Sequence, residues 1–351
     1  MEWYKNRAAY VTYLSDLRYA GAQLDLSSFE DKSVFVSGAN GLIGSCIADM
    51  LLCLSHDKNL NINIILGARR PESLKDRFQY WKGKYVPFQY DAMASDLPSE
   101  DLDFVFHCAS NAHPRAYAEQ PVETAMTNVL GTSNLLSKLA NDGHGRLIYV
   151  SSSEVYGRRS SSDLYSEDDC FPIDSLDPRS CYPLSKRMSE NLCAGFASEY
   201  KVDSVIVRPG HIYGPTQTPY DSRAHAQFAR AAAEGRAIVM KSAGSQFRSY
   251  CYMADCSSAM IFAALHGKNG DVFNISNPDS DCTIAQLASA FAKAGGVDLI
   301  HEQADEVEKR GYARMDNSAV DSSKLRGLGW TGKFSLELGS RRTVELLRSG
   351  I

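Results

Sequence analysis

The sequence predicts an α/β fold, in which a doubly wound parallel sheet is joined by a smaller C-terminal lobe. Short apolar runs typical of buried strands alternate along the chain with longer segments of helical periodicity, which is the pattern of βαβ units. The first apolar run is followed directly by three glycines at intervals of three residues, Gly38, Gly41 and Gly44. A glycine-rich turn between a buried strand and a helix is typical of parallel sheets that bind a dinucleotide.

The composition indicates a globular protein with a substantial core. Of the 351 residues, 44% are hydrophobic and 23% are charged, and the formal net charge is −5. A mildly negative chain is poorly suited to nucleic acid or an anionic membrane surface as its main partner. No apolar run reaches the 18 residues that predict a transmembrane helix, and the first residues do not resemble a secretory signal. The nine cysteines form no Cys-x-x-Cys pair, so we expect reduced thiols, a cytoplasmic location and no metal site.

Residues 1–30 are expected to form a helical arm, because Ala9, Leu14 and Leu17 recur at helical spacing. This arm either caps the domain behind it or packs on a neighbouring subunit. A dinucleotide-binding domain is expected over 31–215 and a mainly substrate-binding lobe over 216–351. Buried strands are expected at 33–37, 63–66, 104–107, 147–150 and 205–207, and helices at 129–139, 183–200, 224–234 and 283–294.

The turn over 38–44 is expected to hold the pyrophosphate of a dinucleotide. Its glycines permit a tight turn and a close approach of the backbone to the ligand, and the following helix directs its N-terminus at the phosphates. After the second strand, Arg69 and Arg70 stand where NAD-preferring sites usually carry an acidic residue. Because arginines there can receive a 2′-phosphate, both NAD and NADP remain open. Asp91 is placed to accept a hydrogen bond from the adenine amino group.

A second signal is Tyr182 followed by Lys186, four residues apart on one helical face. An ammonium beside a phenol is expected to lower the phenol pKa, and the phenol can then accept a hydroxyl proton while nicotinamide accepts the hydride. The pair begins a helix about thirty residues after Ser151, Ser152 and Ser153, which leave the strand at 147–150. Hydroxyls at that end of a parallel sheet face the crevice where ligands bind.

With these motifs in place, the chain resembles an extended short-chain dehydrogenase/reductase of the NAD-dependent epimerase/dehydratase family, which modifies nucleotide sugars. The resemblance covers roughly residues 32–330. It rests on the segments 38–44, 107–114, 151–157, 182–186, 208–215 and 244–255 and on Asn128. It implies a Rossmann fold and an enzyme that binds a nucleoside-diphospho-sugar and oxidises the sugar at C4 with NAD(P).

The resemblance also implies roles for individual residues. Tyr182 would be the base at the C4 hydroxyl, Lys186 would modulate its pKa, and Ser152 would share the proton. The implied cofactor-binding residues are Gly38, Asn40, Gly41, Leu42, Ile43, Gly44, Arg69, Asp91, Ala92, Ala109, Asn128, Tyr182 and Lys186. The implied substrate-binding residues are His113, Tyr117, His211 and Arg248. His211 stands where the family usually has an asparagine that holds the sugar diphosphate.

Residues beside Ser152 bear on the reaction. The 4,6-dehydratases of the family carry an aspartate where this chain has Ser153, while the UDP-glucuronate decarboxylases resemble this chain at both Ser153 and Glu154. In that group an arginine matching Arg248 is proposed to assist protonation at C5. We therefore expect Ser153, Glu154 and Arg248 to complete the catalytic set of a UDP-hexuronate decarboxylase acting on a UDP-sugar.

Other reactions remain open at this point. A 4-epimerase needs Tyr182 but not Glu154, and a 4,6-dehydratase needs a substitute acid. An NADPH-dependent ketoreductase is suggested by Arg69 and Arg70. A non-catalytic dinucleotide sensor is the alternative outside enzymes. Family members usually form homodimers through a four-helix bundle, so a homodimer through the helices around 122–139 and 183–200 is expected.

Overall fold

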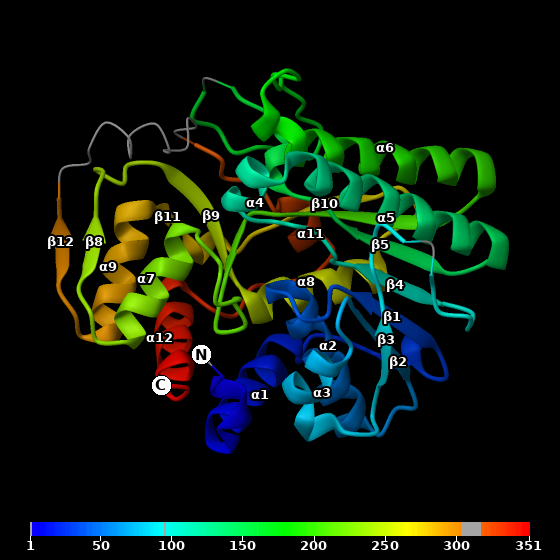
Figure 1. Cartoon of the computed structure of the whole chain (residues 1–351), viewed down its shortest axis with the longest axis horizontal. Helices are drawn as coiled ribbons and strands as arrows, with labels where there is room; N and C mark the ends of the chain where they lie inside the picture. The colour runs from blue at the N-terminus through cyan, green and yellow to red at the C-terminus, as the bar shows by residue number, and fades with distance from the viewer. Residues whose placement is uncertain (1, 95, 160, 303–316) are drawn as a thin grey trace.

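A seven-stranded parallel sheet forms the centre of the larger lobe (Figure 1). The structure is a computed structural model that describes residues 2–94, 96–159, 161–302 and 317–351. The strand order is β10-β6-β5-β4-β1-β2-β3, and every neighbouring pair is parallel. The strands are β1 (Ser33–Ser37), β2 (Asn63–Ala68), β3 (Val86–Gln89), β4 (Phe104–His107), β5 (Arg146–Val150), β6 (Asp203–Pro209) and β10 (Val272–Ile275). The predicted fold class is confirmed.

Helices cover both faces of this sheet because each central strand is apolar on both sides. In β1, Val34 and Val36 belong to the core under α2 and α8, while Phe35 belongs to the core under α5 and α6. These helices are α2 (Leu42–Lys58), α5 (Pro121–Asp142), α6 (Cys181–Tyr200) and α8 (Met253–His266). Two shorter ones, α3 (Glu72–Arg77) and α4 (Pro114–Glu119), follow β2 and β4. None of the helices in the described ranges has the length and apolarity needed to cross a bilayer.

The smaller lobe lies beside the sheet on the left of Figure 1. A three-stranded sheet of order β11-β9-β7 joins it to the larger lobe, and β8 pairs with β12 at its outer side. Its elements are β7 (His211–Tyr213), α7 (Ala224–Ala233), β8 (Ile238–Met240), β9 (Phe247–Tyr252), β11 (Asp281–Thr283), α9 (Ile284–Gly295), β12 (Leu299–His301) and α12 (Leu336–Arg348). The short helix α11 (Ser323–Gly327) instead packs on β10 of the large sheet.

The boundary between the two lobes, expected at residue 215, is not a single point in the sequence. Both α8 and β10 lie after it in sequence, yet α8 packs on α2 and β10 completes the large sheet beside β6. Nearly all of α8 is buried from Met253 to Ala264, which suits a helix held between a sheet and a neighbouring helix. The chain therefore crosses from the larger lobe into the smaller one and returns.

The N-terminal segment takes the first of the two placements expected for it. Its helix α1 (Arg7–Gly21) packs on α2 and α8 of the same chain. Gly21 permits this close approach, because a Cβ there would lie 2.6 Å from a methyl group of Leu54 on α2. Apolar and aromatic residues on one face of α1 are buried, as the helical spacing predicts.

Candidate active site

The residues predicted to carry chemistry gather at the carboxyl ends of neighbouring strands. From β1 the chain proceeds outward to β2 and β3, whereas β4 lies on the other side of β1 and leads to β5 and β6. Ligands bind at such a reversal in open parallel sheets. Gly38 follows β1, Ala109 follows β4, and Ser152 follows β5, so the three segments meet at one edge of the sheet.

The glycine turn after β1 fits a dinucleotide pyrophosphate. Gly38 has φ +67°, and a Cβ on it would lie 2.8 Å from the backbone nitrogen of Ala109. A Cβ on Gly44 would lie 2.4 Å from the carbonyl oxygen of Gly38. Since Gly41 is the N-cap of α2 and has no side chain, the first amides of α2 are left for a ligand. Leu42 and Ile43 form the first turn of that helix.

A buried serine and histidine lock the ends of β1 and β4 together beside this turn. The Ser37 hydroxyl accepts hydrogen bonds from the backbone amides of Cys108 and Ala109 at 3.1 and 3.2 Å. It lies 2.8 Å from Nδ1 of His107. Because the hydroxyl oxygen already accepts two amides, its proton is directed at Nδ1, and the imidazole is neutral. Burial accordingly lowers the pKa of His107 to about 3.

The residues predicted for the adenosine end are mostly exposed. The Arg69 guanidinium lies 3.9 Å from the Glu123 carboxylate and is 70% exposed. Asp91 accepts a hydrogen bond from the amide of Met93 at 3.0 Å, so one of its carboxylate oxygens stabilises the turn in which it lies. Asn40 donates to the Ser73 hydroxyl. Ala92 is buried under α5, where a Cβ on Gly131 would meet it at 2.8 Å.

Asn128, also predicted to contact the cofactor, is fully buried and ties α5 to α6. Its amide nitrogen donates to the Ser185 hydroxyl at 2.9 Å, and its amide oxygen accepts from the Ser110 hydroxyl at 2.8 Å. Because Ser185 lies between Tyr182 and Lys186 on α6, Asn128 positions the helix that carries both of these residues.

Tyr182 lies in a buried aromatic contact with Tyr117 of α4. The two rings are stacked with their centroids 4.5 Å apart. Burial and the negative charge of Glu154 raise the pKa of Tyr182 to about 12, while a hydrogen bond from the Ser152 hydroxyl and the positive charge of Arg223 oppose the rise. The phenol therefore holds its proton more tightly than a free tyrosine does. The surrounding groups have opposite effects on its pKa.

Lys186 lies near Tyr182, yet the pKa of the phenol is not lowered as the sequence led us to expect. Its ammonium donates to the carbonyl of Val150 at 2.7 Å and lies 5.8 Å from the centroid of the Tyr182 ring. Burial lowers the pKa of Lys186 itself to about 8. The pKa of Tyr182 is raised rather than lowered because burial of the phenol is the largest influence on it, and the role of Lys186 toward this phenol stays a prediction.

The segment after β5 places a carboxyl beside this tyrosine. Ser152 caps the 3₁₀ helix Ser153–Tyr156, and its hydroxyl accepts from the Glu154 amide at 3.2 Å. Ser153 is buried. The Glu154 side chain is exposed, yet surrounding protein raises the pKa of its carboxyl. The charges of Arg179, Arg223 and Arg248 act in the other direction.

The predicted substrate residues come from the joining sheet and from α4. Arg248 on β9 is buried and donates to the carbonyl of Phe247 at 2.8 Å. His211 on β7 lies beside it, since β7 and β9 are neighbours and His211 pairs with Tyr250. Burial and the charge of Arg248 lower the pKa of His211 well below its usual value, so it is neutral. His113 caps α4 and accepts from the Ala116 amide at 3.3 Å.

Arg223 is a residue of this site that the sequence analysis missed. Three hydrogen bonds, at 2.9, 3.2 and 2.5 Å, hold its guanidinium against the Asp221 carboxylate. Its charge lowers the pKa values of Tyr117, Tyr182 and Glu154. The only signal in the sequence was an aspartate two residues before an arginine at the start of a predicted helix, which by itself predicts only a helix cap.

The described part of the chain shows no group of three or more His, Cys, Asp or Glu side chains arranged to hold a metal ion. All nine cysteines are free thiols.

Residues 34–276 match the model of the NAD dependent epimerase/dehydratase family. UDP-glucuronic acid decarboxylase 1 of Xenopus tropicalis is 26% identical over 92% of this chain and 74% of its own length. UDP-N-acetyl-alpha-D-glucosaminuronate decarboxylase of Bacillus cytotoxicus is 28% identical over 90% of this chain and 98% of its own length. The crystal structure of UDP-glucuronic acid 4-epimerase from Bacillus cereus, with UDP-glucuronic acid and NAD, has a TM-score of 0.76 and 24% identity over 91% of this chain and all of that one.

Proposed function

Because the chain belongs to the NAD dependent epimerase/dehydratase family, we propose that it decarboxylates a UDP-hexuronate after transient oxidation of the sugar at C4. UDP-glucuronate is the substrate we favour. Two relatives that align along most of this chain are a UDP-glucuronate decarboxylase and a UDP-N-acetylglucosaminuronate decarboxylase by name. Both names describe removal of the C6 carboxylate from a UDP-sugar, which supports the hexuronate as the substrate class.

The cofactor is NAD. The turn of Gly38, Gly41 and Gly44 with the first amides of α2 would hold its pyrophosphate, since added Cβ atoms would fill this space. Bound NAD would supply a hydride acceptor for C4 and return the hydride at the end of the cycle. The other assigned cofactor residues lie around this turn, at the ends of β2, β3 and β4, and on α5 and α6.

Tyr182 would accept the proton of the C4 hydroxyl. Its pKa of about 12 is high for a base at neutral pH. Tyr182 can therefore act as a base only if neighbouring groups stabilise the phenolate. Ser152 donates to the phenol oxygen and thereby stabilises the phenolate, and Arg223 stabilises it through its positive charge. Lys186 donates to the Val150 carbonyl and would thereby hold α6 against the end of β5, rather than lower the pKa of the phenol.

A ketone at C4 makes the C6 carboxylate a β-keto acid. The C5–C6 bond then breaks, its electron pair enters the ketone to give an enolate, carbon dioxide leaves, and C5 must receive a proton. The observation that carries the proposal is the position of Glu154, on the short helix capped by Ser152 and close enough to Arg179, Arg223 and Arg248 for their charges to act on its carboxyl. Guanidinium groups bind carboxylate and phosphate, and a carboxyl of raised pKa can deliver a proton.

The test is incubation of the protein with NAD and either UDP-glucuronate or UDP-N-acetylglucosaminuronate. We expect carbon dioxide and a UDP-pentose, or its acetamido counterpart, detected by trapping and mass spectrometry. A product of unchanged mass would instead identify a 4-epimerase, and loss of 18 Da a dehydratase. Stoichiometric use of NADPH would indicate a ketoreductase, and binding without turnover a dinucleotide sensor; any of these results would overturn the proposal.

We also propose that the protein is a homodimer through α5 and α6. These helices pack side by side on one face of the molecule (Figure 1). They leave Val122, Met126 and Met188 exposed by 75%, 43% and 46%, which suits an apolar contact with the same helices of a second copy. Light scattering should give twice the chain mass, and Met188→Glu should give a monomer. A monomeric mass for the unaltered protein would contradict this assembly.

Finally, we propose that the protein works in the cytoplasm. The support is its nine free thiols, of which Cys46, Cys53, Cys193, Cys251, Cys256 and Cys282 are buried. Reducing compartments keep thiols in this state. Fractionation with detection of the native chain tests this location, and recovery with a secreted or membrane fraction would contradict it.

A further inference from the structure

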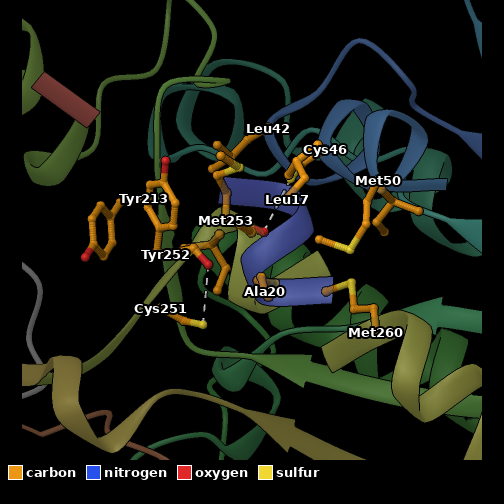
Figure 2. Close-up of a cluster of buried hydrophobic side chains, with 14 of the residues drawn as sticks. Leu17, Ala20, Leu42, Cys46, Met50, Tyr213, Cys251, Tyr252, Met253 and Met260 are labelled. Carbon is orange, nitrogen blue, oxygen red and sulfur yellow. Dashed lines mark hydrogen bonds between the residues drawn. The ribbon is translucent and has the colours of Figure 1, made fainter. Parts of the chain in front are cut away.

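The N-terminal arm, formed by residues 3–5 and α1, lies outside the segment that matches the family, yet one face of it is deeply buried. Trp3, Tyr13 and Leu17 are each no more than 1% exposed. Figure 2 shows α1, carrying Leu17 and Ala20, between side chains of α2 and side chains from the end of β9 and from α8. The arm therefore occupies the junction between the cofactor side and the substrate side of the molecule.

On the cofactor side, the arm is tied to a buried carboxylate on α2. Tyr10 and Tyr13 donate to the two oxygens of Asp49 at 2.7 and 3.0 Å. Arg77 of α3 forms an ion pair with the same carboxylate at 2.5 Å. Asp49 is fully buried, so these donors replace the water that the carboxylate has lost. The arm is thus fixed to the helix that begins at the glycine turn.

On the substrate side, the arm is tied to the ends of β7 and β9. The Trp3 indole donates to the carbonyl of Pro215, two residues beyond β7, at 2.8 Å. The Tyr252 hydroxyl, at the end of β9, donates to Asp16 of α1 at 3.1 Å. Arg342 of α12 forms an ion pair with the same aspartate at 3.1 Å. These two strands pair with each other and carry His211 and Arg248.

We propose that the arm is a positioning element that holds β7 and β9 at a set place relative to α2. Its residues touch neither ligand; they act by keeping His211 and Arg248 aligned with the glycine turn. This inference rests on the proposed function in assigning those two residues to the nucleotide sugar. A purely stabilising arm would make the same contacts, so the test must separate alignment from stability.

A double-mutant cycle makes that separation. Tyr10→Phe removes one of the arm's two hydrogen bonds to Asp49 of α2, and Tyr252→Phe removes its hydrogen bond to the end of β9; the two hydroxyls share no hydrogen-bond partner. Each variant should weaken UDP binding by about 5-fold, the size of one hydrogen bond, measured by calorimetry well below the melting temperature. If the arm connects the two sides, the double variant should bind no more weakly than the weaker single variant. Independent losses, multiplying to about 25-fold, or unchanged affinity would overturn the proposal.

A matched control is Tyr85→Phe, which removes a tyrosine hydrogen bond to the Leu74 carbonyl outside the arm. It should leave UDP affinity unchanged. If Tyr10→Phe fails to fold, Tyr13→Phe, which removes the other donation to Asp49, takes its place in the cycle. If Tyr252→Phe fails to fold, Trp3→Phe takes its place; it removes the donation to Pro215 together with part of the buried ring that packs on Tyr13.

A second measurement does not depend on the substrate. Tyr10→Phe should raise amide hydrogen exchange in β9, although Tyr10 contacts α2 and not that strand, and Tyr85→Phe should not. Unaltered exchange in β9 would overturn the proposal. If the unaltered protein fails to bind UDP, the proposed function fails instead, and the exchange experiment still decides the role of the arm.

Discussion

The rings of Tyr117 and Tyr182 lie nearly parallel, with centroids 4.5 Å apart and planes inclined by 18°. Tyr117 comes from α4 and Tyr182 from α6, so the short helix after β4 orients the proposed base. Tyr117 lowers the pKa of Tyr182, while Tyr182 raises the pKa of Tyr117, which is the pattern expected when the Tyr117 hydroxyl donates toward the Tyr182 oxygen. The stack therefore buries the phenol while its partner helps to stabilise the phenolate.

Tyr182→Phe is expected to lower kcat by about 10²- to 10⁴-fold, because the group that accepts the C4 proton is removed. UDP affinity should change by less than about 2-fold, since the stacked ring remains. Steady-state kinetics and calorimetry measure the two effects. Tyr117→Phe is the matched control: it keeps the stack, loses one donated hydrogen bond and should cost about tenfold or less. A Tyr182→Phe enzyme with near-normal kcat would exclude this tyrosine as the base.

Glu154→Gln should slow the delivery of a proton to C5, and therefore formation of the UDP-pentose, while leaving oxidation at C4 in place. The amide keeps the size and the hydrogen-bonding shape of the side chain but cannot deliver a proton. The expected readout is a loss of about 10²-fold or more in UDP-pentose formation, with reduced nicotinamide still appearing at 340 nm. Glu119→Gln, on the exposed face of α4, should have no effect. Unimpaired formation of the UDP-pentose by Glu154→Gln would remove Glu154 from the mechanism.

Arg223→Gln should shift the acid limb of the kcat/KM profile to higher pH. The guanidinium lowers the pKa values of Tyr182 and Glu154, so its removal raises both, by up to about one unit. A group that must lose its proton then does so only at higher pH. Kinetics over pH 6–11 measure the shift, as a lower kcat/KM at each pH along this limb, and Arg236→Gln in an exposed pair with Glu234 is the control. A shift toward lower pH would contradict this assignment.

Stability should fall with acidity because His107 is buried in its neutral form. Its pKa is about 3 in the folded protein and about 6.5 when unfolded. The unfolded chain therefore binds the extra proton between these values, and the stabilisation present above pH 6.5 is lost as the pH falls. One such group contributes about 1.4 kcal/mol per pH unit. His107→Gln should reduce the slope by about that amount between pH 6 and 4 in urea titrations.

The control for this prediction is His144→Gln. His144 is exposed and contacts only the Asp142 carbonyl among the contacts described, so the slope should be unchanged. Equal slopes for His107→Gln and the unaltered protein would show that His107 is not a buried neutral group.

NAD should bind more tightly than NADP, because the Glu123 carboxylate lies 3.9 Å from Arg69 and repels a 2′-phosphate. Glu123→Gln should narrow the difference by about 2- to 5-fold, the effect of one partly screened charge. Fluorescence titration with both cofactors at low salt measures the ratio. Glu72→Gln, an exposed change at the start of α3, serves as the control. Tighter binding of NADP by the unaltered protein would reverse the conclusion.

The fold class and the location of the cofactor turn could be predicted from the sequence because they depend on local patterns. Residues 33–37 form β1 with the predicted bounds, and α2 begins directly after Gly41, with Gly44 in its first turn. Tyr182 and Lys186 share a face of α6 because four residues is close to one helical turn. Such features need only neighbours in the chain, so one sequence suffices.

The balance of charges at the site could not be predicted in this way. Arg223 reaches Tyr182 from a loop of the other lobe, and Glu154 raises the pKa that Lys186 was expected to lower. Burial decides the sign of these shifts, and burial is a property of the packed molecule. The same holds for the stacking of Tyr117 on Tyr182, which joins residues 65 positions apart in sequence.

What the sequence alone determined was the order of strands, turn and helix, and the residues that stand at the strand ends. Only the tertiary structure decided that the N-terminal arm joins α2 to β9 and that α8 and β10 return to the large sheet. Local periodicity records which side of an element is apolar, but not which distant surface covers it. Which surface covers an apolar side depends on how well the two packed surfaces fit, and these surfaces exist only once the chain has folded.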